Sequence, residues 1–230
     1  MSETAFDLDA YLGRIGCPGG LGGDLASLSR VVAAHSASIP FENIDVLLGR
    51  PPKLDIGALQ AKLVGSRRGG YCFEQNLLLR SALQALGFET TSMIARVVRG
   101  FPADAARFAT HVVIRVGLSE GSFLVDVGFG NLTPTAAIAL APNVEQATPH
   151  GAMRLVPVGS EVVLQAQVGD TWENLWRLCS QTVVDADYEV ANWFTATHPA
   201  SPFVGNMIAA RPLPGGRRRT FLNGSLALRR

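Results

Sequence analysis

The spacing of apolar residues changes its period near residue 92, and this change limits the folds open to the chain. Before that point apolar residues recur at three- and four-residue steps, for example over 25–35, 56–64 and 72–86, which is typical of amphipathic helices. After it, short runs of alternating apolar and polar residues are separated by Gly and Pro, which indicates antiparallel strands. The sequence therefore predicts an α+β protein in which an N-terminal helical bundle precedes a small antiparallel β-barrel.

The predicted strands are 91–98, 109–116, 123–127, 153–158, 162–168 and 172–178. Asp24 and Asp55 stand where the N-caps of two of the predicted helices belong. We expect three regions: 1–92 as a helical domain, 93–190 as a β-barrel domain, and 191–230 as a linker and lid region.

Composition narrows the classes of function. The chain has 230 residues and a formal net charge of +1, which gives no reason to expect a nucleic acid or an acidic membrane surface as the main partner. No apolar stretch is long enough to span a bilayer, and no metal-ligand spacing occurs among the Cys and His residues. Three widely spaced cysteines without a signal peptide favour a reducing cytoplasm.

Cys72 is the cysteine in a position that favours reactivity. It follows Gly69 and Gly70 and occupies the first turn of the helix predicted over 72–86, and Gly87 stands at the C-terminal cap. Unsatisfied N–H groups and the positive end of the macrodipole stabilise a thiolate at such a position. The alternative is a buried cysteine that acts as a small apolar residue.

A predicted hairpin supplies the partners that a nucleophilic thiol needs. His111 lies in the strand over 109–116, and Asp126 lies in the next strand, over 123–127. An even-numbered loop puts both side chains on one face, directly opposite for a loop over 117–120 and diagonally for a two-residue turn at Ser119 and Glu120. A carboxylate inside an apolar strand also needs a partner, because an unpaired buried charge is costly.

Together these residues predict a nucleophile, a base and an orienting group: Cys72, His111 and Asp126. Each residue alone has an ordinary structural explanation: Cys72 as a buried thiol, His111 as a strand-edge histidine and Asp126 as a capping carboxylate. The order and spacing of the three leave both a peptidase and an acyltransferase open.

Three blocks of the sequence resemble the signature segments of the arylamine N-acetyltransferase family. They are 67–76 (RRGGYCFEQN), 110–111 (TH) and 125–130 (VDVGFG). Segments 7–12, 39–45, 148–151 and 187–193 also resemble the family and follow its order. The resemblance implies a cysteine-protease-like Cys-His-Asp core and a ping-pong reaction through an acetyl-cysteine. Acetyl-CoA would be the donor, and an arylamine, arylhydrazine or N-hydroxyarylamine the acceptor, with no metal.

The resemblance also implies binding residues. Phe41 and Phe129 resemble the aromatic wall of the acceptor pocket, and Thr110, Gly130 and Phe203 resemble residues that line the coenzyme cleft. The family usually continues past the position of Arg230 into a region that covers the barrel. We therefore expect a shortened C-terminal α/β lid, weaker coenzyme binding and a homo-oligomer that covers an open sheet edge.

Three other functions stay open. An amide synthase of the same fold would use the acyl-cysteine to close an aromatic polyketide, and a shortened binding protein would not turn over at all. A papain-like or transglutaminase-like enzyme would use the same three residues on peptide amides, although the flanking segments do not resemble those families.

Overall fold

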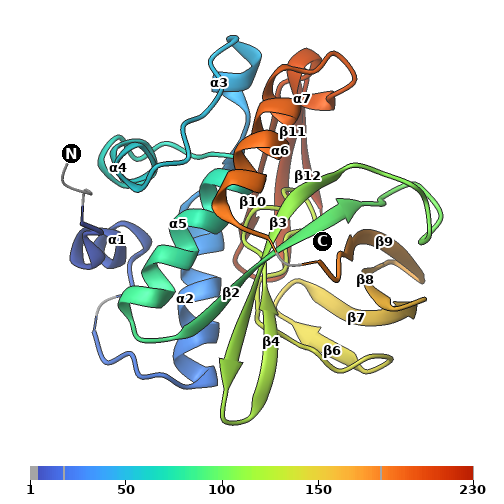
Figure 1. Ribbon diagram of the computed structural model, residues 1–230, viewed down its shortest axis with the longest axis horizontal. Coiled ribbons are helices and arrows are strands. Elements are labelled where there is room, and N and C mark those ends of the chain that lie inside the picture. The colour runs from blue at the N-terminus through green and yellow to red at the C-terminus, as the bar shows by residue number, and fades with distance from the viewer. Residues whose placement is uncertain (1–4, 18, 182, 230) are drawn as a thin grey trace.

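The computed structural model describes residues 5–17, 19–181 and 183–229, with the helices α1 to α5 before the long run of antiparallel strands and α6 and α7 after it (Figure 1). The helices are α1 (Leu8–Ile15), α2 (Leu25–Ser38), α3 (Ile44–Leu47), α4 (Ile56–Leu59), α5 (Cys72–Ala85), α6 (Asp185–Thr197) and α7 (Pro202–Gly205). Both predicted caps are confirmed, since the Asp24 and Asp55 carboxylates each accept a hydrogen bond from the N–H group three residues later. None of the helices among these residues is long and apolar enough to cross a membrane.

The helix predicted over 56–64 is only partly correct. It divides into α4 and a π-helical turn over Gln60–Gly65, in which the Ser66 N–H group donates to the Ala61 carbonyl oxygen (2.8 Å). This turn carries Lys62, whose ammonium group bridges the carboxylates of Asp45 (2.6 Å) and Glu74 (2.7 Å). Tertiary ion pairs of this kind can override a local helical period.

Lys62→Met is expected to lower the free energy of unfolding by about 2–4 kcal/mol, because Glu74 and Asp45 would lose their shared cation inside the protein. Burial raises the pKa of Glu74 to about 7 even though Lys62 acts to lower it, so removal of Lys62 favours the protonated carboxyl further. Urea unfolding measures the change. Lys53→Met, at an exposed lysine, should alter stability by less than about 0.5 kcal/mol. Equal decreases in the free energy of unfolding for Lys62→Met and Lys53→Met would contradict a stabilising role for the Lys62 ion pairs.

Eight strands form one antiparallel sheet in the order β5-β4-β3-β2-β9-β8-β7-β6. They are β2 (Glu89–Val97), β3 (Ala109–Leu118), β4 (Gly121–Val125), β5 (Ile138–Ala139), β6 (Glu145–Thr148), β7 (Gly151–Val158), β8 (Glu161–Val168) and β9 (Thr171–Leu178). The Gln146 side chain on β6 donates to and accepts from the backbone of Ala139 on β5 (2.9 and 2.7 Å), so a side chain joins the two edges. The predicted barrel is thus confirmed as a nearly closed, barrel-like sheet.

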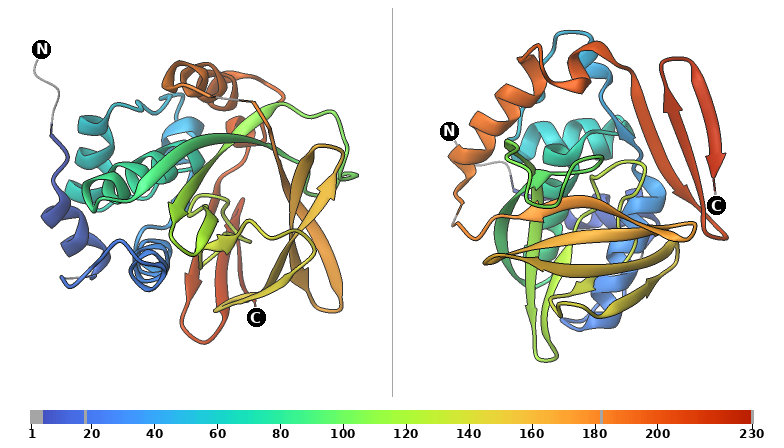
Figure 2. Two further views of the ribbon diagram at one scale, coloured as in Figure 1. Left: turned by 60° about the horizontal axis from the view of Figure 1, so that its bottom comes forward. Right: turned by 90° about the vertical axis from the view of Figure 1, so that its right-hand side faces the viewer.

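A second sheet lies beside the barrel (Figure 2). Its strands are not among the six predicted above, although three of the four fall within 191–230, the region expected to form the shortened lid. Its order is β1-β10-β11-β12, with β1 (Phe41–Glu42), β10 (Ile208–Leu213), β11 (Arg217–Leu222) and β12 (Ser225–Arg229). The division into 1–92, 93–190 and 191–230 stays a prediction, and its outer bounds at 1–4 and 230 lie outside the described residues. The homo-oligomer also stays a prediction.

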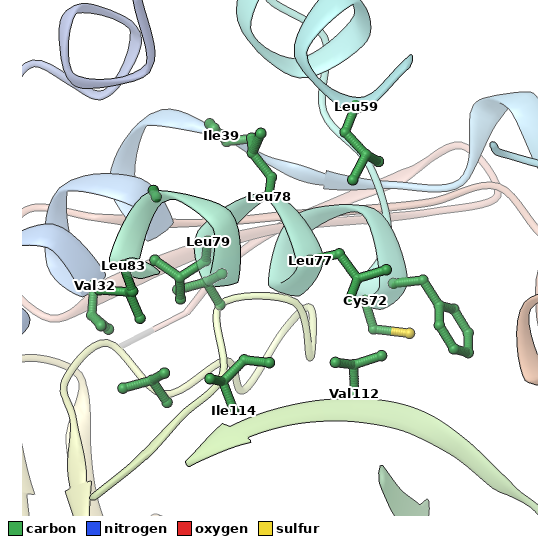
Figure 3. Packing of buried hydrophobic residues seen from close by; sticks show 14 of the residues in the cluster. Val32, Ile39, Leu59, Cys72, Leu77, Leu78, Leu79, Leu83, Val112 and Ile114 are labelled. Carbon is green, nitrogen blue, oxygen red and sulfur yellow. The ribbon is translucent and has the colours of Figure 1, made fainter. Parts of the chain in front are cut away.

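Helix α5 lies at the centre of the main hydrophobic core. Its apolar side chains pack between α2 and strand β3, as Leu83 does beside Val32 and Leu77 above Val112 (Figure 3). A smaller cluster fills the inside of the barrel and contains Trp176 and Leu164. The two clusters meet at β3, because alternate residues of that strand point to opposite faces.

His35 on α2 makes stability depend on pH. Burial lowers the pKa of this histidine to about 3, and its Nδ1 atom is 2.8 Å from the Tyr11 hydroxyl. An unfolded chain binds a proton at His35 below about pH 6.5, whereas the folded protein does not until about pH 3. The unfolding free energy should therefore fall, through this group, by up to about 1.4 kcal/mol per pH unit across that window as the pH decreases.

His35→Gln should remove this contribution, because glutamine does not titrate. Urea unfolding of both proteins at pH 7 and pH 5 gives the difference in slope. An identical pH dependence in the variant would show that His35 does not resist protonation in the folded state.

Candidate active site

Cys72 is the first residue of α5 and has only 4% of its surface exposed. The Glu74 carboxylate accepts a hydrogen bond from the Tyr71 N–H group (3.1 Å) at this helix start. The positive end of the helix macrodipole favours an anion there. The Cys72 thiol donates to the Thr110 carbonyl oxygen on β3, at 3.7 Å. The predicted nucleophile therefore lies at a helix N-terminus, against the strand that carries the predicted base.

Two glycines let the loop before Cys72 pass close to its neighbours. A Cβ atom on Gly69 would lie 2.2 Å from the Pro40 carbonyl oxygen, and one on Gly70 would lie 2.7 Å from the Glu74 carboxylate. Neither position has room for a side chain, so glycine is required there for steric reasons.

Arg14 on α1 holds the same loop from within the protein. Its buried guanidinium donates to the carbonyl oxygens of Leu63 (2.9 Å) and Ser38 (2.9 Å). Longer contacts of 3.4 and 3.5 Å reach the carbonyl oxygens of Arg67 and Arg68. A side chain far away in the sequence thus fixes the backbone that leads into Cys72.

The hairpin brings His111 and Asp126 together as predicted. Strands β3 and β4 are joined by a two-residue turn at Ser119 and Glu120, and the ladder ends at Ile114 opposite Val125. Continued by one step, this register places Asp126 diagonal to His111 on the same face. The His111 Nε2 atom lies 2.6 Å from the Asp126 Oδ2 atom, and both residues are buried.

The Asp126 carboxylate accepts four hydrogen bonds, two on each oxygen. Oδ2 accepts from His111 Nε2 (2.6 Å) and from Trp176 Nε1 (3.0 Å). Oδ1 accepts from Asn76 Nδ2 (3.0 Å) and from the Gly128 N–H group (2.9 Å). Four donors around one buried carboxylate favour its ionised form.

The electrostatics of the pair follow from these contacts. Burial alone would raise the pKa of Asp126, but His111, Asn76 and Gly128 together lower it below its usual value. Burial alone would lower the pKa of His111, but the Asp126 carboxylate and the neighbouring Cys72 raise it. Both shifts favour an imidazolium beside a carboxylate. Because Nε2 faces Asp126, Nδ1 is the ring nitrogen left to exchange a proton with a thiol.

Asn76 and Gly128 join α5 to the hairpin. The Asn76 amide group donates to the Val112 carbonyl oxygen on β3 (2.9 Å), and its oxygen accepts from the Val127 N–H group (2.9 Å). A Cβ atom on Gly128 would lie 2.7 Å from the Cys72 Cα atom. The close approach of the loop after Asp126 to the start of α5 therefore requires glycine.

The predicted binding residues lie beside the Phe41 ring, beside the His111 ring and along a cavity next to Thr110. Gly130 and Phe203 both flank Phe41: a Cβ atom on Gly130 would lie 3.5 Å from the Phe41 ring, and the Phe41 and Phe203 ring centres are 5.9 Å apart. Phe129 lies edge-on to the His111 ring, with centres 5.3 Å apart. Thr110 and Phe203 line a cavity of about 190 Å³ together with Phe108 and Phe194.

Sequence reasoning assigned no role to two residues that contact this network. Asn76 stands in the quoted motif, and its distance of one helical turn from Cys72 was an available signal. Trp176 gave no signal, because a tryptophan in an alternating strand is ordinary core. Among the described residues, no group of three or more His, Cys, Asp or Glu side chains is arranged to hold a metal ion.

Known proteins match this chain over most of its length. The model of the N-acetyltransferase family matches residues 24–230. An arylamine N-acetyltransferase of Mycolicibacterium smegmatis is 45% identical over 210 residues, 90% of this chain and 76% of the relative. An arylamine N-acetyltransferase / N-hydroxyarylamine O-acetyltransferase of Salmonella typhimurium is 38% identical over 221 residues, 96% of this chain and 78% of the relative. The structure of Mycobacterium marinum arylamine N-acetyltransferase in complex with CoA superimposes with a TM-score of 0.93 at 40% identity, covering 97% of this chain and 83% of that one.

Proposed function

The chain belongs to the arylamine N-acetyltransferase family, and from this membership we propose that Cys72, His111 and Asp126 carry out its acetyl transfer. The protein is an acyltransferase that moves an acetyl group from acetyl-CoA to arylamines. Support for the three residues comes from the 2.6 Å contact between His111 and Asp126 beside a buried thiol at a helix N-terminus. Arylhydrazines and N-hydroxyarylamines are further acceptors in this proposal.

In the first half-reaction Cys72 attacks the thioester carbonyl carbon. His111 takes the thiol proton on Nδ1, and the Asp126 carboxylate stabilises the resulting imidazolium through Nε2. Backbone N–H groups at the start of α5 are the proposed donors to the oxyanion. His111 then returns the proton to the departing coenzyme thiol, which leaves the acetyl group on the Cys72 sulfur atom.

In the second half-reaction His111 acts as the base for the acceptor. It takes a proton from the amine nitrogen as that nitrogen attacks the acetyl carbon, and gives the proton to the Cys72 sulfur as the C–S bond breaks. The acetyl group forms an amide and the enzyme returns to its starting state. Phe41 and Phe129 are proposed to contact the aromatic ring of the acceptor, and Thr110, Gly130 and Phe203 the coenzyme.

An ester assay tests this function. Release of p-nitrophenol from p-nitrophenyl acetate should be slow when hydrolysis of the acetyl-enzyme is the only outlet, and should accelerate when an arylamine such as 4-aminosalicylate is added. Acceleration that saturates with amine concentration supports transfer. Release that is unaffected by any arylamine or arylhydrazine would contradict the function.

A further inference from the structure

Trp176 contacts both members of the His111–Asp126 pair from strand β9, which β2 separates from the hairpin of β3 and β4. It lies on β9, opposite Val97 of β2 and Leu164 of β8. Its side chain is 1% exposed, and its indole Nε1 atom is 3.0 Å from the Asp126 Oδ2 atom. Its ring stacks on the His111 ring, with centres 6.5 Å apart and planes 28° apart.

The acceptor of the Trp176 indole N–H group is the observation that suggests a role for this contact. A buried indole N–H group needs an acceptor, and a backbone carbonyl would satisfy it equally well. Trp176 instead donates to the carboxylate oxygen that also binds His111. A hydrogen bond to an ionised carboxylate is stronger than one to a neutral group, and it stabilises the anion.

From these contacts we propose that Trp176 is a positioning residue, whose indole N–H group fixes Asp126 Oδ2 and sets the basicity of the His111–Asp126 pair. This proposal rests on the proposed function. With the indole donor in place the carboxylate holds its negative charge in a fixed direction, and the stacked ring restricts rotation of the imidazole. Without the indole donor, the Asp126 carboxylate becomes more basic, and the His111 imidazolium releases its proton at a higher pH.

Few other side chains on α5 and β9 could change the proton affinity of the His111–Asp126 pair. From α5, Cys72 is the titratable side chain that faces the pair, and Asn76 is neutral. On β9, the neighbouring Arg177 points elsewhere, with its Nε atom 2.7 Å from Glu161. Of these two β9 side chains, it is therefore the Trp176 indole that affects the proton affinity of the His111–Asp126 pair.

Trp176→Phe tests the proposal by removing the donor while keeping an aromatic ring. We expect kcat for the acetylation of 4-aminosalicylate to fall by about 10- to 100-fold, the range for a hydrogen bond to a charged group, with little change in KM. Both limbs of the pH profile of kcat should move to higher pH, because the pair then binds its protons more tightly.

Two variants separate this effect from loosened packing. Trp172→Phe removes a tryptophan from the same strand that stacks on Arg154 instead, and it should leave the profile unchanged. Leu164→Ala removes apolar volume opposite Trp176, and it should lower stability without moving either limb. A Trp176→Phe profile whose limbs stay in place would overturn the proposal, even if the plateau drops.

A measurement on the unmodified protein covers the case in which Trp176→Phe does not fold. Of three indole N–H signals in a proton–nitrogen correlation spectrum, one should resist exchange with deuterium and shift as the His111–Asp126 pair titrates. No turnover is needed, so this test can succeed or fail independently of the proposed function. Three indole signals that do not titrate would refute the positioning role.

Discussion

Replacing Cys72 with alanine is expected to reduce acetyl transfer by at least about 10³-fold, to the background of the uncatalysed reaction. Alanine offers no nucleophile, and no other group described at the start of α5 can replace the sulfur atom in a covalent step. The substitution removes one atom from a nearly buried position, so the fold and the binding of coenzyme should persist. Stopped-flow release of p-nitrophenol measures the rate, and thermal unfolding checks the fold.

The other two cysteines provide matched controls. Cys17 and Cys179 are both buried free thiols, so Cys17→Ala and Cys179→Ala remove the same atom from equally enclosed positions. Each should retain nearly the full rate of transfer. If either control loses activity while Cys72→Ala keeps it, the nucleophile is assigned to the wrong residue.

Asp126→Asn should lower kcat by about 10³- to 10⁴-fold, the second largest effect that we expect. A neutral amide cannot stabilise an imidazolium as a carboxylate does. The Asp126 side chain also accepts hydrogen bonds on both oxygens, so either orientation of an asparagine turns its NH₂ group toward two donors. We therefore expect a loss of stability of about 1–3 kcal/mol as well.

Single-turnover kinetics with acetyl-CoA separate the two consequences of this substitution. The acetylation step should be slow even at a temperature where circular dichroism shows a folded protein. Asp185→Asn is the control, because Asp185 pairs with Arg80 (2.5 Å) at an exposed site. An Asp126→Asn variant that acetylates at the normal rate would remove Asp126 from the proposed mechanism.

Local patterns in the sequence predicted the parts of the fold that hold the site. The 3.6-residue period placed Cys72 at the first residue of α5, and strand parity placed His111 and Asp126 on one face. Both rules depend on backbone geometry over a few residues, which is why they work without an alignment. The strand boundaries differed by only one or two residues for the same reason.

Other features depend on contacts that no local pattern records. Strand β1 is two residues long and exists because it pairs with β10, far along the chain. The strands β10 and β11 contain Pro212 and the run Arg217–Arg219, which obscure an alternating pattern. The donation from Trp176 to Asp126 depends on the strand order β4-β3-β2-β9 and on the curvature of the sheet, which turns the β9 side chain toward the hairpin.

Peptide mass spectrometry after brief incubation with acetyl-CoA tests the central claim most directly. The account predicts one added acetyl group, on the peptide that contains Cys72, with the Cys17 and Cys179 peptides unmodified. The group should disappear when an arylamine is added, and acetylated amine should form in equal amount. A protein that turns over acetyl-CoA and arylamine while Cys72 stays unmodified, under conditions that trap an acyl-enzyme, would contradict it.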